Sequence, residues 1–111
     1  LDSFDSEKLT QYRKSWNNVD TIRAMCDDYR AAIHFDWALD KEDRNRCLEI
    51  PACVMWGKTG AMAQHFDVPA TWSKNFSNIE KKPMEGGHFF PDQYPQETVS
   101  ALVSFIINNT N

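Results

Sequence analysis

The residues best suited to chemistry lie between positions 85 and 95, where His88 follows two glycines and precedes two aromatic residues. Histidine has an unperturbed pKa of ~6.5, which suits proton transfer near neutral pH. Gly86 and Gly87 allow a sharp backbone turn, with a positive φ if one is needed. Such a turn would hold the imidazole at the end of a strand, where sites on α/β sheets are found. The alternative is a histidine without a chemical role in a glycine-rich turn before a helix.

The other candidate ligands do not form a metal site. His34 and His65 have no partner at metal-binding spacing. Cys26, Cys47 and Cys53 also lack such spacing, and we expect reduced, part-buried thiols. Neither a metal nor a cofactor is therefore expected.

The composition argues against two classes of binding partner, nucleic acids and membranes. A net charge of -4 without a basic stripe argues against nucleic-acid binding. No apolar run approaches the ~20 residues that span a bilayer, and no signal peptide heads the chain. We therefore expect no membrane partner and a cytoplasmic location. Because 41% of the residues are hydrophobic and 13% aromatic, general disorder is not expected.

Helices are predicted for the first half of the chain. Asp5 can cap a helix that ends at Asn17 and Asn18. A second helix is predicted from about residue 20 to residue 39, and residues 40–46 are predicted to be a charged connection or short helix. The apolar positions of the second helix follow a 3.6-residue period, but Phe35 and Trp37 fall off this stripe. The stripe consists of Ile22, Met25, Tyr29, Ala32 and Ile33.

The pattern changes to α/β from about residue 50. The continuous apolar run at 50–57 predicts a strand buried on both faces of a parallel sheet. We then expect a loop at 58–69, a helical turn or two at 70–76, and a second, more polar strand at 79–84. The last helix should begin at Pro95 and bury a stripe formed by Val99, Leu102, Val103 and Ile106. Two strands cannot bury both faces of the first one, so this section looks like the closing part of a larger fold.

Residues 54–57, 86–89 and 94–98 resemble the last third of an α/β-hydrolase. The run Met25-Cys26-Asp27-Asp28-Tyr29-Arg30-Ala31-Ala32, with residues 4–5 and 12–13, is similar to fluoroacetate (haloacetate) dehalogenases, of which epoxide hydrolases are near relatives. The resemblance implies an α/β fold class. Residues 1–47 would be cap-domain helices, and residues 48–111 would be the C-terminal part of the hydrolase core, with the last two parallel strands, the catalytic-histidine loop and the final helix.

In that family an aspartate displaces halide from the substrate carbon, and a histidine then deprotonates the water that hydrolyses the resulting ester. The resemblance makes His88 the catalytic general base. It makes Tyr29 a substrate-binding residue that hydrogen bonds the departing halide, although packing with Met25 and Ile33 is the alternative. The family's nucleophile and carboxylate-binding arginines lie upstream of the matched part. Asp67 is a poor candidate for the triad acid and a better one for a loop or cap residue.

Three interpretations remain open at this stage. The chain is a hydrolase fragment, of dehalogenase or epoxide hydrolase type, that handles a small-molecule substrate only when the N-terminal half is supplied. Alternatively it is a non-catalytic interaction module, which could form a homo-oligomer through its exposed sheet. A third interpretation is that the missing half is encoded upstream of this sequence.

We predict that the purified 111 residues do not release fluoride from fluoroacetate, because the nucleophile and the orienting acid are absent from the chain. Fluoride release can be measured with an ion-selective electrode. Turnover above a buffer blank would contradict this prediction.

Overall fold

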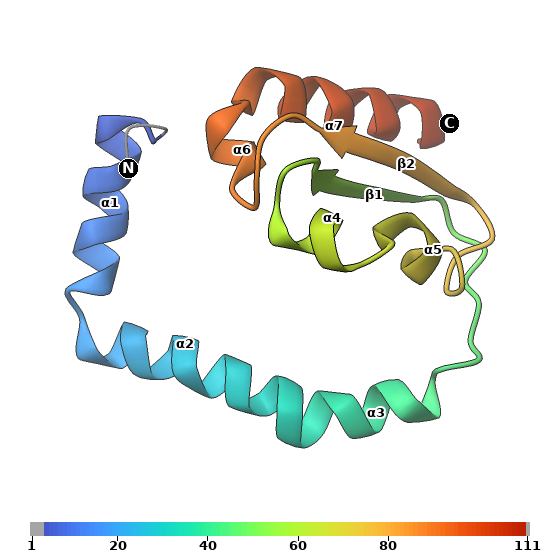
Figure 1. The fold of residues 1–111 in the computed structure, drawn as a ribbon, viewed down its shortest axis with the longest axis horizontal. Helices are drawn as coiled ribbons and strands as arrows, with labels where there is room; N and C mark the ends of the chain where they lie inside the picture. The colour runs from blue at the N-terminus through green and yellow to red at the C-terminus, as the bar shows by residue number, and fades with distance from the viewer. Residues whose placement is uncertain (1–3, 111) are drawn as a thin grey trace. The chain divides into compact units, whose positions relative to one another are not determined.

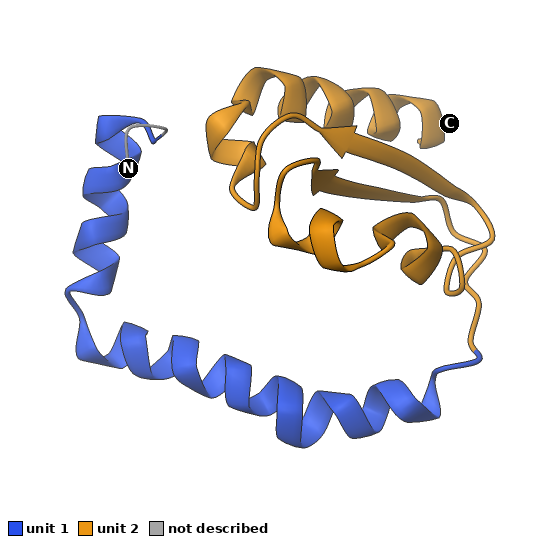
Figure 2. Cartoon of the chain, viewed as in Figure 1, with its two compact units in different colours: residues 1–45 blue, residues 46–111 orange. Residues whose placement is uncertain are grey.

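A computed structural model describes residues 4–110, which fall into two compact units. The first unit extends to Asn45 and the second begins at Arg46 (Figure 2). The sequence predicts this boundary two residues later, between 47 and 48. Within the described residues, no helix combines the length and the apolar character needed to cross a membrane.

The first unit begins with α1 (Ser6–Trp16), and its caps follow the sequence signals. The Asp5 carboxylate accepts hydrogen bonds from the backbone N–H groups of Glu7 and Lys8 at 3.0 and 3.1 Å. These bonds satisfy N–H groups that a helix start leaves without partners. Asn17 ends α1, and the side chain of Asn18 caps the next helix, so the predicted break is confirmed.

The second predicted helix is three successive segments: α2 (Val19–Ala31), the π-helix η1 (Ala32–Asp36) and α3 (Trp37–Glu42). In the π segment the N–H of Trp37 bonds to the carbonyl of Ala32, five residues earlier. This wider turn rotates the residues that follow relative to an uninterrupted α-helix. It therefore accounts for the break in the apolar period at Phe35 and Trp37.

The second unit contains the two predicted strands. β1 (Ala52–Gly57) and β2 (Ile79–Met84) are parallel, with Ala52 opposite Ile79 and Gly57 opposite Met84. The connection between them carries α4 (Ala61–His65) and α5 (Val68–Trp72). The predicted loop at 58–69 is therefore wrong. Alanine, methionine and glutamine favour helix, but the stretch is too short for its period to be recognised.

Asp67 caps α5, as the sequence suggested. Its carboxylate accepts a hydrogen bond from the N–H of Ala70 at 2.9 Å. Pro69 lies in the first turn of the same helix, where a missing N–H costs nothing. Asp67 thus has a structural role at this helix start.

Two helices follow β2, the short α6 (Phe90–Gln93) and the long α7 (Pro95–Asn109). α6 was not predicted, whereas α7 begins at Pro95 as expected. α7 lies along one side of the sheet, against β2, and α4 and α5 lie on the other side, against β1 (Figure 1). The second unit is therefore a layered α/β arrangement with helices on both faces of a two-stranded sheet.

The described residues bury very little of their apolar surface. Met84, 7% exposed, is the one buried hydrophobic residue among them. The predictions of a fully buried first strand and a buried stripe on α7 are both wrong for this chain by itself. β1 is only half-buried, and the predicted α7 stripe is between 43% and 58% exposed. Two strands and short helices provide too little surface to cover these side chains.

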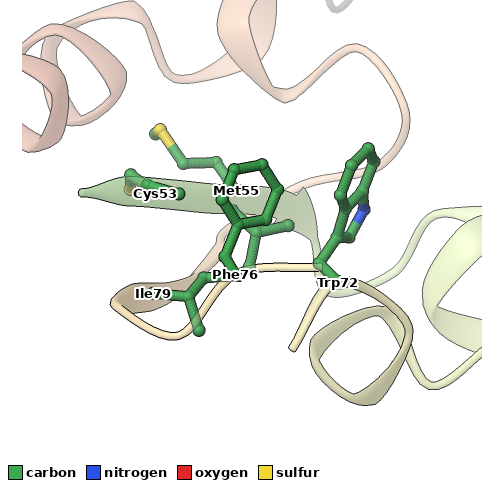
Figure 3. A pocket seen from close by; sticks show the side chains of 7 residues that line it. Cys53, Met55, Trp72, Phe76 and Ile79 are labelled. Atoms are coloured by element: carbon green, nitrogen blue, oxygen red, sulfur yellow. The ribbon is translucent and has the colours of Figure 1, made fainter. Parts of the chain in front are cut away.

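An open hollow of about 310 Å³ lies against β1. Figure 3 shows Cys53 and Met55 of β1 beside Trp72 and Phe76, which come from the connection between the strands. Burial raises the pKa of the Cys53 thiol, as expected for a part-buried cysteine. Cys26 and Cys47 are exposed instead, and all three thiols are free.

Candidate active site

The parallel pairing of β1 and β2 places the loops after both strands at the same end of the sheet. The N–H of Lys58 bonds to the carbonyl of Met84 at 2.9 Å, and the N–H of Thr59 bonds to the carbonyl of Gly86 at 3.0 Å. His88 follows in the second of these loops. It therefore lies at the carboxyl end of the sheet, the position at which α/β folds build their sites.

Glycines allow these two loops to approach closely. A Cβ atom at Gly57 would lie 1.9 Å from the carbonyl oxygen of Gly87, which is far inside van der Waals contact. At Gly60 a Cβ atom would lie 3.0 Å from the backbone nitrogen of His88. The backbone of the His88 loop thus rests against the backbone of the loop after β1. A side chain at Gly57 would push the two loops apart.

Gly86 has a φ of 93°, a positive value of the kind that the glycine pair allows. A Cβ atom there would also approach the side-chain oxygen of Gln93 to 2.5 Å and the ring of Tyr94 to 2.8 Å. Glycine is therefore required for two reasons, its conformation and the crowding around it. The turn before His88 is shaped by contacts on several sides.

The turn is also held by a side chain that the sequence analysis did not single out. The N–H of Gly87 donates to the side-chain oxygen of Gln93 at 2.9 Å, and the N–H of Phe90 donates to the carbonyl of Gly87 at 3.1 Å. The sequence offers one signal for this contact, a polar side chain six residues after Gly87. It can be recognised only if the short helix α6 is predicted first.

The His88 side chain is exposed, and its ring lies edge-on to Phe89 with 5.1 Å between the centroids. The neighbouring carboxylate of Glu85 forms an ion pair with Lys58 across the two loops. Glu85 is thus engaged by a cation. The imidazole is open to a substrate or to groups supplied by another polypeptide segment.

Tyr29 lies in α2 of the first unit, whereas His88 belongs to the second. Its side chain is 76% exposed, and Met25 and Ile33 on the same stripe are exposed as well. The phenol is therefore not buried by packing within the described residues. Among those residues no group of three histidine, cysteine or acidic side chains could hold a metal ion.

The chain has been compared with known proteins. No protein-family model matches the sequence. A candidate α/β-hydrolase from Nostoc sp PCC 7120 is 31% identical, with a TM-score of 0.88 over 96% of this chain and 36% of that structure. A mutant of a candidate epoxide hydrolase from Pseudomonas aeruginosa is 26% identical, with a TM-score of 0.86 over 99% of this chain and 38% of that structure. The chain folds as the C-terminal section of an α/β-hydrolase.

Two further relatives are also matched over nearly all of this chain but over only about a third of their own length. A fluoroacetate dehalogenase from Burkholderia sp is 37% identical over 105 residues, which are 95% of this α/β-hydrolase section and 34% of the relative. A candidate acyltransferase from Salmonella enterica is 27% identical, with a TM-score of 0.88 over 96% of this chain and 36% of that structure. The chain spans about a third of the length of the relatives that it matches.

The contact between the two loops can be tested by comparing alanine substitutions at two glycines, one crowded and one with space for a Cβ atom. Gly57→Ala should force them apart, whereas Gly87→Ala should be tolerated because its nearest neighbouring atoms would lie at 3.9 and 4.0 Å. A backbone clash of this kind costs about 1–3 kcal/mol. In a chimera in which this chain replaces the matched 105 residues of the Burkholderia fluoroacetate dehalogenase, the Lys58 and Thr59 amides should therefore exchange roughly tenfold faster with Gly57→Ala. Hydrogen exchange followed by NMR measures these rates. Equal rates in the two variants would show that the close approach does not hold the loops.

Proposed function

We propose that this α/β-hydrolase section supplies the general base, His88, to a dehalogenase-type hydrolase that acts on a haloacetate. The observation that carries the proposal is the position of His88 at the carboxyl end of β2, in a turn packed against the loop after β1. The 37% identity to a fluoroacetate dehalogenase supports the substrate class. The nucleophile would come from polypeptide outside this chain.

The proposed chemistry has two steps. A carboxylate displaces halide from the substrate carbon, which breaks the carbon–halogen bond and forms an ester between the substrate and the enzyme. His88 then removes a proton from water, and the hydroxide attacks the carbonyl carbon of the ester. The ester C–O bond breaks, the departing alkoxide takes the proton from His88 and leaves as the 2-hydroxy acid, and the regenerated carboxylic acid releases its proton to solvent. His88 thus acts in the second step.

Tyr29 is proposed to assist the first step. A neutral phenol O–H can donate a hydrogen bond to the departing halide and stabilise its developing negative charge. The exposure of Tyr29 in this chain leaves its hydroxyl available for this role. A replacement by phenylalanine would remove the donor while keeping the ring.

Two specific observations favour alternatives. The structural similarity to a candidate epoxide hydrolase favours an epoxide as the substrate, which the same histidine chemistry could process through an ester. The exposed apolar side chains on α7 and the half-buried apolar strand β1 favour a role in assembly, including a homo-oligomer formed through the sheet. The dehalogenase proposal is preferred because it has the higher sequence identity.

The test is a chimera in which this chain replaces the matched 105-residue part of the Burkholderia fluoroacetate dehalogenase. We expect it to release fluoride from fluoroacetate, and we expect His88→Gln to lower turnover by at least about a thousandfold. In that variant the first step survives, so the covalent ester should accumulate and be visible by intact-protein mass spectrometry.

The matched control is His65→Gln, which changes an exposed histidine in α4. It should retain turnover within about twofold, since exposed substitutions away from a site have small effects. Turnover in His88→Gln close to that of the chimera would contradict the proposed base. Hydrolysis of epoxides without release of fluoride would favour the alternative substrate.

A further inference from the structure

Gln93 makes a side-chain hydrogen bond to Gly87, the residue directly before His88. Gln93 is the last residue of α6 and is half-buried, and its own N–H bonds to the carbonyl of Phe89 at 3.1 Å. Its side chain turns back toward the glycines and accepts the N–H of Gly87 at 2.9 Å. Only the carbonyl oxygen of a glutamine amide can accept from an N–H, so this bond fixes the orientation of the amide.

The peptide unit between Gly86 and Gly87 is bonded at both ends. Its carbonyl oxygen accepts from the N–H of Thr59 at 3.0 Å, and its N–H donates to Gln93 at 2.9 Å. One bond comes from the loop after β1, and the other comes from the helix after the turn. Together these two bonds define the plane of this peptide unit. The next peptide unit joins Gly87 to His88.

Such a restraint is needed at this position. A peptide unit between two glycines has little intrinsic preference, because neither residue has a Cβ atom to limit φ and ψ. Rotation of this unit would redirect the backbone that carries His88 and would move the imidazole. The neighbouring Lys58–Glu85 ion pair is exposed, and exposed pairs contribute little rigidity. The part-buried bond to Gln93 is the stronger restraint.

We propose that Gln93 is a positioning residue that fixes the peptide unit between Gly86 and Gly87 and thereby aims His88 at the water that it deprotonates. This inference rests on the proposed function of His88. Gln93 touches neither the substrate nor the reacting atoms in this scheme. Its effect should therefore be confined to the step in which His88 acts.

The experiment compares Gln93→Leu and Gln93→Glu in the same chimera. Leucine removes the acceptor at similar size, and glutamate keeps an oxygen that can accept from Gly87. We expect Gln93→Leu to lower kcat by roughly 10- to 100-fold, as expected for a misplaced catalytic group, and to lower KM in parallel, because kcat/KM depends only on the steps up to halide release. Gln93→Glu should restore kcat to within about threefold of the chimera.

The transient kinetics separate positioning from general damage. In Gln93→Leu the initial burst of fluoride should keep its rate, while the slow hydrolysis of the ester limits later turnover. A structural defect would slow both phases. The control, Gln96→Leu, changes an exposed glutamine in the first turn of α7 and should alter neither phase.

Amide exchange at Gly87 provides a readout that does not require activity. The Gly87 N–H should exchange faster in the Gln93→Leu chimera than in the unsubstituted chimera and in the Gln93→Glu chimera. Unchanged exchange in Gln93→Leu, equal loss of both kinetic phases, or failure of glutamate to restore kcat would each overturn the role of Gln93. An active His88→Gln chimera would instead overturn the proposed function.

Discussion

Two parallel strands must end at the same end of a sheet, and the candidate site depends on this constraint. The pairing of β1 with β2 brings Gly57 opposite Met84 and so places the loops that follow them side by side. Backbone hydrogen bonds from residues 58 and 59 then connect the two loops. Because Gly57 has no side chain, the carbonyl of Gly87 can rest against it. The path of the backbone that leads to His88 thus depends on the sheet and on the glycines together.

The sequence predicted those features that depend on neighbouring residues. Asp5 caps α1, the apolar run at 50–57 contains β1, and Gly86 takes the positive φ that a glycine allows. Each of these depends on local chemistry: a side-chain acceptor, an apolar run, or a missing Cβ atom. Such signals can be recognised without knowledge of the rest of the fold.

The features that were missed depend on contacts or on very short segments. α4 and α6 are too short to display a helical period. The apolar period breaks at Phe35 and Trp37, but this break does not by itself distinguish the π turn at Ala32–Asp36 from a change of helix face. The role of Gln93 depends on α6, because this helix brings the side chain back to the N–H of Gly87. The expected burial of β1 and α7 failed because burial depends on surfaces that the chain does not provide by itself.

The apolar surface on β1 and α7 indicates that this α/β-hydrolase section would be stabilised by polypeptide that covers it. Among the described residues β1 pairs with β2 alone, so the other side of an uncharged strand has no strand beside it. The open hollows along β1 are lined by apolar side chains, including Met55, Trp56 and Trp72. Uncharged, apolar strands of this kind are normally covered in a folded protein. Further polypeptide is therefore expected on both β1 and α7.

The most direct test of this account is equilibrium unfolding of the 111 residues in urea, followed by circular dichroism at several protein concentrations. If the core requires further polypeptide, the isolated chain should show no cooperative transition that is independent of concentration. A gradual loss of signal, or a midpoint that rises with concentration as copies cover one another, agrees with the account. A cooperative transition with the same midpoint at every concentration would show an autonomous fold and would contradict it.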